Sequence, residues 1–264
     1  MFKVIKTIVK FFFAFAFAIL LAFFIKLYFL EAYNVPTDSM RPTIESGDFI
    51  FINKYIYGDF ENKFFKVPTL ISRKPEKKDV VVFKIFHPDS LRGKTLIKRI
   101  YAKSGDKLSL FDKYILINEK KDDSAIEEKY FFNYNLLKKE FKQILQKGIR
   151  IPKKGEYVVL DLENLFLYEN LIKSEEKTVE IKNSKIYVDG IETKLYPIKH
   201  NCYFLIGDNI EVSYDSRAFG LIPEKDIIGK AIIVYFSMNN SFATSDFFSF
   251  FSSIRFSRIG NIIN

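Results

Sequence analysis

The feature that most constrains this chain is an apolar run near its start. Residues 11–30 carry a single charged side chain, Lys26, and three lysines, Lys3, Lys6 and Lys10, precede them. At about 1.5 Å of helix per residue, such a run covers the roughly 30 Å hydrocarbon core of a bilayer, and Lys26 lies near enough to the far end to reach the headgroups. Positive charge before a span holds that side in the cytoplasm. The sequence therefore predicts a single-pass anchor, with residues 1–10 in the cytoplasm and the rest of the chain outside.

A cleavable leader is the alternative interpretation of the same run. Leaders have a shorter apolar core, of about 7–15 residues, followed by small residues at the cleavage site. Here the longer run is followed by Glu31, Ala32, Tyr33 and Asn34, most of them bulky or charged. The pattern favours a retained anchor, whereas a cleaved leader would give a mature amino terminus near residue 32.

Composition narrows the class of the remainder. Hydrophobic residues make up 48% of the 264 positions and charged residues 28%, which excludes wholesale disorder. The single cysteine, Cys202, excludes an intrachain disulfide framework, and two histidines, His87 and His200, leave little basis for a zinc site. The net charge of +9 is spread over stretches of mixed sign, so we expect no nucleic-acid partner.

Short apolar runs dominate the chain after the anchor and predict a mainly β fold. The run over 79–85 is apolar at nearly every position, which is typical of a strand buried on both faces. Strands are predicted over 47–54, 79–85, 95–103, 113–118, 185–190, 203–206 and 231–236.

Two segments between these strands carry a helical pattern instead. A first helix is predicted because apolar residues recur at steps of three and four before Gly148, which ends it. Its apolar positions are Tyr130, Tyr134, Leu137, Phe141, Ile144 and Leu145. A second, shorter helix is predicted over 162–173.

The final segment, residues 237–264, is rich in phenylalanine and serine. It is too interrupted to span a membrane, and two interpretations stay open: a segment at the membrane interface or a packed terminal helix. The predicted organisation is therefore a cytoplasmic terminus at 1–10, an anchor at 11–30, a catalytic β domain at 31–118 and 181–236, an insertion with helical segments at 119–180, and the tail.

Three motifs follow the anchor in a fixed order. They are Pro36-Thr-Asp-Ser-Met-Arg-Pro-Thr43 with Gly47-Asp48, then Ile97-Lys-Arg-Ile100 with Gly105-Asp106, then Gly207-Asp-Asn-Ile-Glu-Val-Ser-Tyr-Asp-Ser-Arg217 with Gly220 and Pro223. Each motif alone is modest, but the ordered set resembles the type I signal peptidases, membrane-bound Ser/Lys proteases. The resemblance covers the anchor and most of residues 33–110 and 150–236, and it implies a signal-peptidase-like β-fold.

The chemistry that this resemblance implies is acyl transfer to a serine. Ser39 corresponds to the nucleophile of the family and Lys98 to its general base. A serine hydroxyl needs such a base, but a lysine with an ordinary pKa of about 10.4 is protonated at neutral pH. The apolar neighbours Leu96, Ile97 and Ile100 make burial of Lys98 plausible, and burial lowers a lysine pKa. Taken alone, Lys98 would be read as a strand lysine that faces water.

The resemblance also assigns supporting residues. Thr37 corresponds to a hydroxyl that forms the oxyanion hole with the backbone N–H of Ser39, although a turn residue is the simpler interpretation. Ser213 corresponds to a serine that orients the lysine amine, and Asp215 and Arg217 to a structural ion pair beneath the site. No cofactor and no metal are implied.

Two departures from the family pattern affect these expectations. In the last motif, Asn209 is followed by Ile210-Glu211-Val212 where the family usually has Arg-Asp-Asn, which puts support of that loop in doubt. Asp38 stands where glycine is common. A carboxylate facing Lys98 would favour the charged amine and oppose catalysis, so we expect Asp38 to point away.

Substrate recognition is implied more weakly. Tyr33, Val35, Ile44 and Ile97 match positions that line the family's pockets for small residues at −1 and −3 of an extended preprotein, although Ile44 is almost equally well read as core. The expected partners are exported preproteins and membrane lipid. The expected location is the bacterial cytoplasmic membrane, with a monomeric catalytic domain on the periplasmic side.

Two functions of other classes remain as alternatives. A catalytically silent relative would bind preproteins or act as a scaffold, and the altered 209–212 stretch leaves this open. An exported adhesin or binding protein would have a cleaved leader instead of an anchor.

Overall fold

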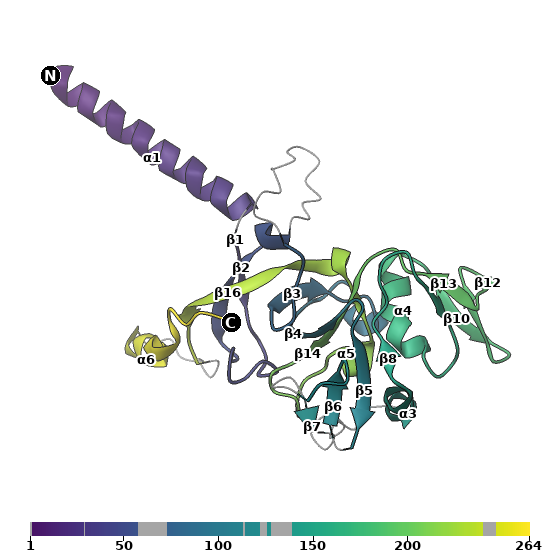
Figure 1. Cartoon of the computed structure of the whole chain (residues 1–264). Coiled ribbons are helices and arrows are strands. Elements are labelled where there is room, and N and C mark those ends of the chain that lie inside the picture. Colours follow the sequence, from purple (N-terminus) through teal and green to yellow (C-terminus); the bar gives the residue numbers. More distant parts are fainter. Residues whose placement is uncertain are drawn as a thin grey trace.

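The protein is described by a computed structural model, which covers residues 2–28, 30–57, 73–112, 114–121, 126–127, 139–239 and 247–264. Helix α1 (Phe2–Tyr28) projects away from the body of the molecule (Figure 1). It begins before the predicted span and ends at Tyr28, and Leu30 already belongs to the first strand. Within the ranges that the structure covers, no helix combines the length and apolar character needed to cross a membrane.

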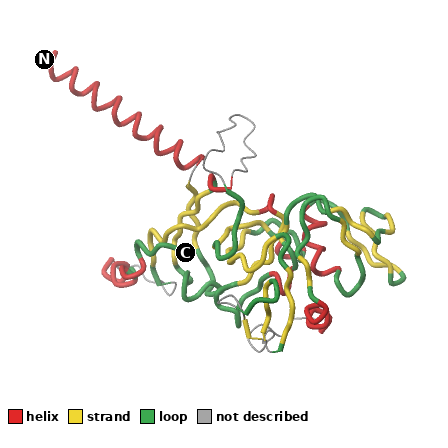
Figure 2. Tube along the Cα trace, in the orientation of Figure 1, coloured by secondary structure: helices red, strands yellow, loops and turns green. Residues whose placement is uncertain are grey.

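The body is mainly β, as predicted, and its largest element is a seven-stranded antiparallel sheet. In Figure 2 the body consists mostly of strands and the loops between them, and its helices are short. Across the sheet, the strands are β1 (Leu30–Asn34), β2 (Asp48–Asn53), β16 (Ile227–Ser237), β3 (Val80–Lys84), β4 (Thr95–Lys103), β14 (Cys202–Ile206) and β15 (Ile222–Pro223).

The burial of these strands follows their sequence patterns. Strand β3 is buried at all four positions from Val80 to Phe83, because it lies inside the sheet and both its faces are covered. Strand β2 alternates between buried and half-buried residues. Strand β16 changes register against its neighbours. At one such point a Cβ on Gly229 would lie 2.6 Å from the main-chain oxygen of Asn53, so only glycine fits there.

Three smaller antiparallel sheets are built from the chain between β4 and β14. The predicted strands over 113–118 and 185–190 are confirmed as β6 and β11, and the other five predicted strands are confirmed in the large sheet. The sheets are β7 (Ile126–Glu127), β6 (Tyr114–Ile117), β5 (Lys107–Phe111) and β8 (Ile149–Arg150); β10 (Val179–Lys182), β11 (Lys185–Val188) and β12 (Ile191–Glu192); and β13 (Leu195–Pro197) with β9 (Tyr157–Val159).

Two helices lie in the same part of the chain, as predicted. In α3 (Lys139–Lys147) the apolar residues Phe141 and Leu145 are fully buried, and Gly148 follows with a positive φ of 84°. The predicted helical positions Tyr130, Tyr134 and Leu137 lie outside the described residues. Helix α4 (Leu165–Ser174) starts three residues after the predicted one.

Short helical turns complete the fold. The segment after the large sheet contains α6 (Phe247–Ser253). Residues 254–264 then run back along β16, with one bridge to it (Ile233–Ile262) and one to the residue that follows it (Met238–Ile254). The remaining elements are α5 (Ser216–Phe219), η1 (Tyr55–Tyr57), η2 (Asp89–Leu91), η3 (Glu224–Asp226) and η4 (Phe256–Arg258).

Candidate active site

Ser39 lies in the loop that joins β1 to β2. Main-chain hydrogen bonds from Val35 N to Asp48 O (2.9 Å) and from Gly47 N to Val35 O (2.8 Å) close the base of this loop. Gly47 has a φ of 85°, a left-handed conformation that favours glycine. The side chain of Ile44 is fully buried beneath the loop, whereas Ser39 is half-buried. The loop therefore has a fixed base and core contacts, and it leaves the serine within reach of a substrate.

Lys98 reaches this serine from β4, where it is paired with Val81 of β3. Its side chain is only 4% exposed. The amine Nζ donates hydrogen bonds to Ser39 Oγ (2.7 Å) and to the main-chain oxygen of Ile97 (2.8 Å). The structure thus brings together the two residues that the sequence singles out as nucleophile and base.

Burial also changes the acidity of Lys98. Removal of the ammonium from water lowers its pKa from 10.5 to about 8; the negative charges of Asp215 and Asp208 oppose this shift, and Arg217 adds to it. At pH 7 such a group is neutral in about 9% of molecules, against well under about 0.1% for an ordinary lysine. A usable fraction of the amine can therefore accept a proton near neutral pH.

Thr37 lies beside the nucleophile. Its Oγ1 is 3.4 Å from Ser39 Oγ, and its side chain is exposed at the mouth of the site. A hydroxyl in this place can turn toward an oxygen of a substrate bound at Ser39. The position suits a donor to a developing oxyanion.

Ser213 lies deeper, 1% exposed, behind the dyad. Its hydroxyl makes no hydrogen bond to any residue that the structure describes, so the bond to Lys98 that the resemblance implies is not formed here. Gly207 makes this close arrangement possible. A Cβ on Gly207 would lie 2.2 Å from Ser213 Oγ and 2.5 Å from the main-chain oxygen of Ser39. Any side chain at this position would therefore push Ser213 and the loop of Ser39 away from Gly207.

Asp215 and Arg217 form a fully buried ion pair below Ser213. Arg217 donates from Nε to Asp215 Oδ1 (2.8 Å) and from Nη2 to Asp215 Oδ2 (2.9 Å). The same carboxylate accepts the main-chain N–H of Gly207 (3.1 Å) and caps α5. The pair therefore fixes the start of the loop 207–213.

The unusual stretch Ile210-Glu211-Val212 is held through its main chain. Arg217 Nη2 donates to the main-chain oxygen of Ile210 (2.7 Å), while the Ile210 side chain packs against the hydrophobic core. Glu211 and Val212 are exposed. Because the support reaches backbone atoms, it does not depend on the side chains that the family usually has there.

Thr43, Arg99 and Asp208, which had no expected role, connect the three motifs by hydrogen bonds. Arg99 donates from Nε and Nη2 to the carboxylate of Asp208, both at 2.7 Å, and Thr43 Oγ1 donates to the same carboxylate (2.5 Å). One residue from each motif thus meets in a single bonded group. The position of Arg99 directly after Lys98, and of Asp208 after Gly207, was the only sequence signal for it.

Asp38 is engaged on the side of its own loop. Its Oδ1 accepts the main-chain N–H of Ser46 (2.9 Å), and its Oδ2 lies 3.7 Å from Arg41. Its main-chain oxygen accepts a bond from Asn209 Nδ2 (3.2 Å). Asp38 is not among the charges that shift the pKa of Lys98.

The four residues expected to line substrate pockets lie in one hydrophobic cluster. Val35 (3% exposed) and Ile44 (0%) belong to its buried core, and Tyr33 and Ile97 pack against it while half-buried. Burial, together with nearby Glu31, raises the pKa of Tyr33 to about 12, so its hydroxyl stays protonated. Only Tyr33 and Ile97 therefore present surface that a substrate could touch.

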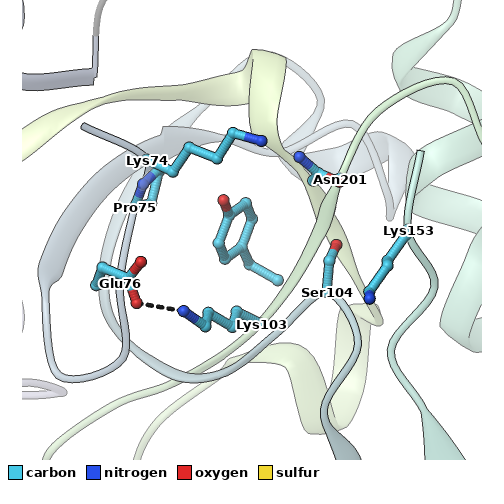
Figure 3. A pocket seen from close by; sticks show the side chains of 8 residues that line it. Lys74, Pro75, Glu76, Lys103, Ser104, Lys153 and Asn201 are labelled. Atoms are coloured by element: carbon cyan, nitrogen blue, oxygen red, sulfur yellow. Dashed lines mark hydrogen bonds and ion pairs between the residues drawn. The ribbon is translucent and has the colours of Figure 1, made fainter. Parts of the chain in front are cut away.

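A separate pocket of about 210 Å³ lies at the far ends of β4 and β14 (Figure 3). It is lined by Lys74, Lys103 and Lys153 among others, and Lys103 is paired with Glu76. Neither Ser39 nor Lys98 lines it. This pocket is not part of the site built around the dyad.

Comparison with known proteins identifies the family of the chain. The family described as signal peptidase, peptidase S26, matches residues 8–236 of the chain. The chain belongs to this family. It is therefore a serine peptidase that cleaves signal peptides, its substrates are preproteins that carry them, and the family uses a Ser/Lys dyad and is membrane-associated.

Individual relatives agree with this membership. Signal peptidase I of Buchnera aphidicola subsp. Baizongia pistaciae is 28% identical over 97% of this chain and 84% of that protein. Signal peptidase I of Rickettsia prowazekii is 32% identical over 88% of this chain and 81% of that protein. A crystal structure of a signal peptidase I from Enterococcus faecalis V583 covers 60% of this chain and 97% of that chain at 16% identity, with a TM-score of 0.27, too low to support a statement about shared geometry.

Proposed function

We propose that Ser39 is the nucleophile and Lys98 the general base with which this signal peptidase cleaves preproteins. The observation that carries the proposal is the 2.7 Å contact between Lys98 Nζ and Ser39 Oγ, made by a lysine that is nearly fully buried. A general base must lie within hydrogen-bond reach of the proton that it removes. Burial supplies the second requirement, a pKa low enough for a neutral amine.

The reaction follows from these positions. Neutral Lys98 takes the proton of Ser39 Oγ as the oxygen attacks the scissile carbonyl, and the backbone N–H of Ser39 and the hydroxyl of Thr37 donate to the oxyanion that forms. The lysine ammonium then gives its proton to the leaving amine, which leaves the signal peptide as an ester on Ser39. A water molecule, deprotonated by Lys98, hydrolyses this ester and restores the free serine.

The preprotein is proposed to bind as an extended strand beside β4. In the described part of the chain, β14 pairs with β4 only from Arg99 to Lys103, so the segment before Arg99 has a free edge next to the dyad. An extended peptide binds such an edge through its main chain. Ile97 lies in this segment of β4, and Tyr33 of β1 packs against the same hydrophobic cluster. Both side chains are half-buried, which suits contact with small residues at −1 and −3.

We further propose that α1 anchors the enzyme in the bacterial cytoplasmic membrane, with a monomeric catalytic domain on the periplasmic side. The support is a run of apolar side chains that are largely exposed to solvent, including Phe11, Phe13 and Phe15, preceded by Lys6 and Lys10. Protease added outside spheroplasts should degrade the catalytic domain. Its protection in sealed spheroplasts would overturn this orientation.

The assignment of the dyad is tested by cleavage of a preprotein with purified full-length protein in detergent. The parent chain should release the signal peptide, and Ser39→Ala and Lys98→Met should not. Ser90→Ala, which changes an exposed serine of η2, is the matched control and should behave as the parent does. Cleavage by Ser39→Ala would overturn the assignment, and a parent without activity would favour the silent scaffold.

A further inference from the structure

The last residues of the chain pack beside the large sheet, next to the loop that holds Ser39. Residues 254–264, here called the C-terminal brace, run beside β16: Gly260 N donates to Val234 O (2.8 Å) and Ile263 N donates to Ile232 O (2.9 Å). The Ile263 side chain is 3% exposed and lies in the same hydrophobic cluster as Val35 and Ile44. The brace is therefore packed against the base of the nucleophile loop.

Two arginines of the brace bind the nucleophile loop directly. Arg258 donates from Nη2 (2.6 Å) and Nε (3.1 Å) to Asp48 Oδ2, and its Nη1 lies 3.2 Å from Glu45 Oε1. Arg255 donates to Glu45 Oε2 (2.9 Å) and to the main-chain oxygen of Ser46 (2.6 Å). Together they hold the loop where it returns to β2, whereas near its middle the main-chain oxygen of Ser39 accepts the N–H of Asn209 (3.1 Å).

Asp48 is the centre of this group and is completely buried. Burial opposes its ionisation, but bonds from Arg258, from Glu45 N (2.8 Å) and from Ser237 Oγ (2.7 Å) outweigh burial and hold its pKa below the usual value. A buried carboxylate is stable only while such partners remain. Arg258 of the brace therefore helps to keep Asp48 charged in this place.

The brace also reaches the strand of the base. The main-chain oxygen of Asn264 accepts a hydrogen bond from Arg99 Nη1, and Arg99 directly follows Lys98 and binds Asp208 and Thr43. One short segment thus contacts the loop of the nucleophile at one end and the strand of the base at the other.

We propose that Arg255 and Arg258 are positioning residues for catalysis, which hold the nucleophile loop so that Ser39 Oγ stays within reach of Lys98 Nζ. This inference rests on the proposed dyad and extends it to residues that touch neither substrate nor the reacting atoms. Misplacement of a reacting group by about 1 Å can cost about a hundredfold in rate. A loop whose return is no longer held should therefore lose kcat rather than substrate affinity.

The test compares Arg255→Gln and Arg258→Gln with Arg150→Gln in the full-length protein. Arg150 is a suitable control because it is also bound to a carboxylate, that of Glu156 (2.7 Å), on β8 outside the dyad. Steady-state cleavage of a preprotein is measured well below each melting temperature, with the folded fraction taken from circular dichroism. We expect kcat per folded molecule to fall at least about tenfold in both brace variants, while KM stays within about twofold of the parental value. The rise of the rate toward alkaline pH should be unchanged in these variants. Arg150→Gln should have the same kinetics as the parent.

Rescue separates positioning from folding. Arg258→Lys keeps a positive charge beside Asp48 but cannot donate hydrogen bonds from two nitrogens of a planar guanidinium. It should therefore fold and show an intermediate kcat. It replaces Arg258→Gln if that variant does not fold. Two results would overturn the inference and leave the dyad intact. One is that the brace variants melt at a lower temperature but keep the parental kcat. The other is that Arg258→Gln does not fold while Arg258→Lys keeps the full kcat. A parent chain that does not cleave would instead overturn the proposed dyad, and this inference with it.

Discussion

Replacement of Lys98 by methionine should abolish cleavage and, at neutral pH, make the protein more stable. The folded-state pKa of Lys98 is about 8, below its ordinary 10.5. Between these two values the unfolded chain binds more protons than the folded one, so the free energy of unfolding rises with pH across this window. Below pH 8 the buried lysine therefore costs the fold about 3 kcal/mol.

The methionine variant removes this cost and loses two hydrogen bonds. Lys98 Nζ donates to Ser39 Oγ and to Ile97 O, and each bond contributes about 1 kcal/mol. The net result is a gain of about 1 kcal/mol at pH 7. Near pH 10.5 the cost of protonation has mostly gone, and the same substitution should destabilise the fold by about 1–2 kcal/mol.

Urea unfolding of the parent and Lys98→Met at pH 7 and pH 10.5 measures this change of sign. Lys194→Met, which alters an exposed lysine, is the control and should show no such dependence. Other alkaline titrations affect parent and variant alike and cancel in the difference. A difference between the two proteins that stays constant with pH would refute the lowered pKa, and with it the reason why this lysine can act as a base.

The other substitutions test the surroundings of the dyad. Thr37→Ala should lower kcat by a factor of about 10²–10³ with little change in KM or melting temperature, and Thr37→Ser should keep most of the activity. An unchanged kcat in Thr37→Ala would show that Thr37 is not part of the oxyanion hole. Gly207→Ala should lower kcat strongly, because its Cβ would meet Ser213 and the main chain of Ser39, and parental kinetics would contradict that crowding. Asp215→Asn leaves the buried charge of Arg217 without its partner and should lower the free energy of unfolding by about 3–5 kcal/mol, whereas a loss below about 1 kcal/mol in urea unfolding would indicate a surface-like pair.

Local pattern was enough to predict five of the seven strands of the large sheet, all except β1 and β15. The run over 79–85 is β-branched and apolar at successive positions, and it forms the strand that is buried on both faces. The run over 185–190 ends in Asp189-Gly190, both with positive φ, which is the turn that an Asp-Gly pair favours. Periodicity reports which faces are covered, so it identifies such elements without any knowledge of their partners.

The contacts that complete the site could not be predicted in this way. Arg258 and Asp48 are separated by 210 residues, and nothing in the spacing of a serine- and phenylalanine-rich tail indicates which carboxylate its arginines bind. The tail was expected to be either a segment at the membrane interface or a packed helix. Neither interpretation included the packing of residues 254–264 beside β16. The hydroxyl of Ser213 forms no hydrogen bond within the part of the chain that the structure describes. Whether such a bond forms depends on small differences in distance, which sequence patterns do not carry.

The pH dependence of kcat/KM for preprotein cleavage tests the central claim most directly. If Lys98 acts as the base with a pKa of about 8, kcat/KM should rise about tenfold between pH 7 and pH 9 and then level off. A base with an ordinary lysine pKa would give a rise of about a hundredfold over the same range and no plateau before about pH 10. The tenfold rise with its plateau is the expected result, and either the steeper continuing rise or a flat profile would contradict catalysis by a buried, neutral Lys98.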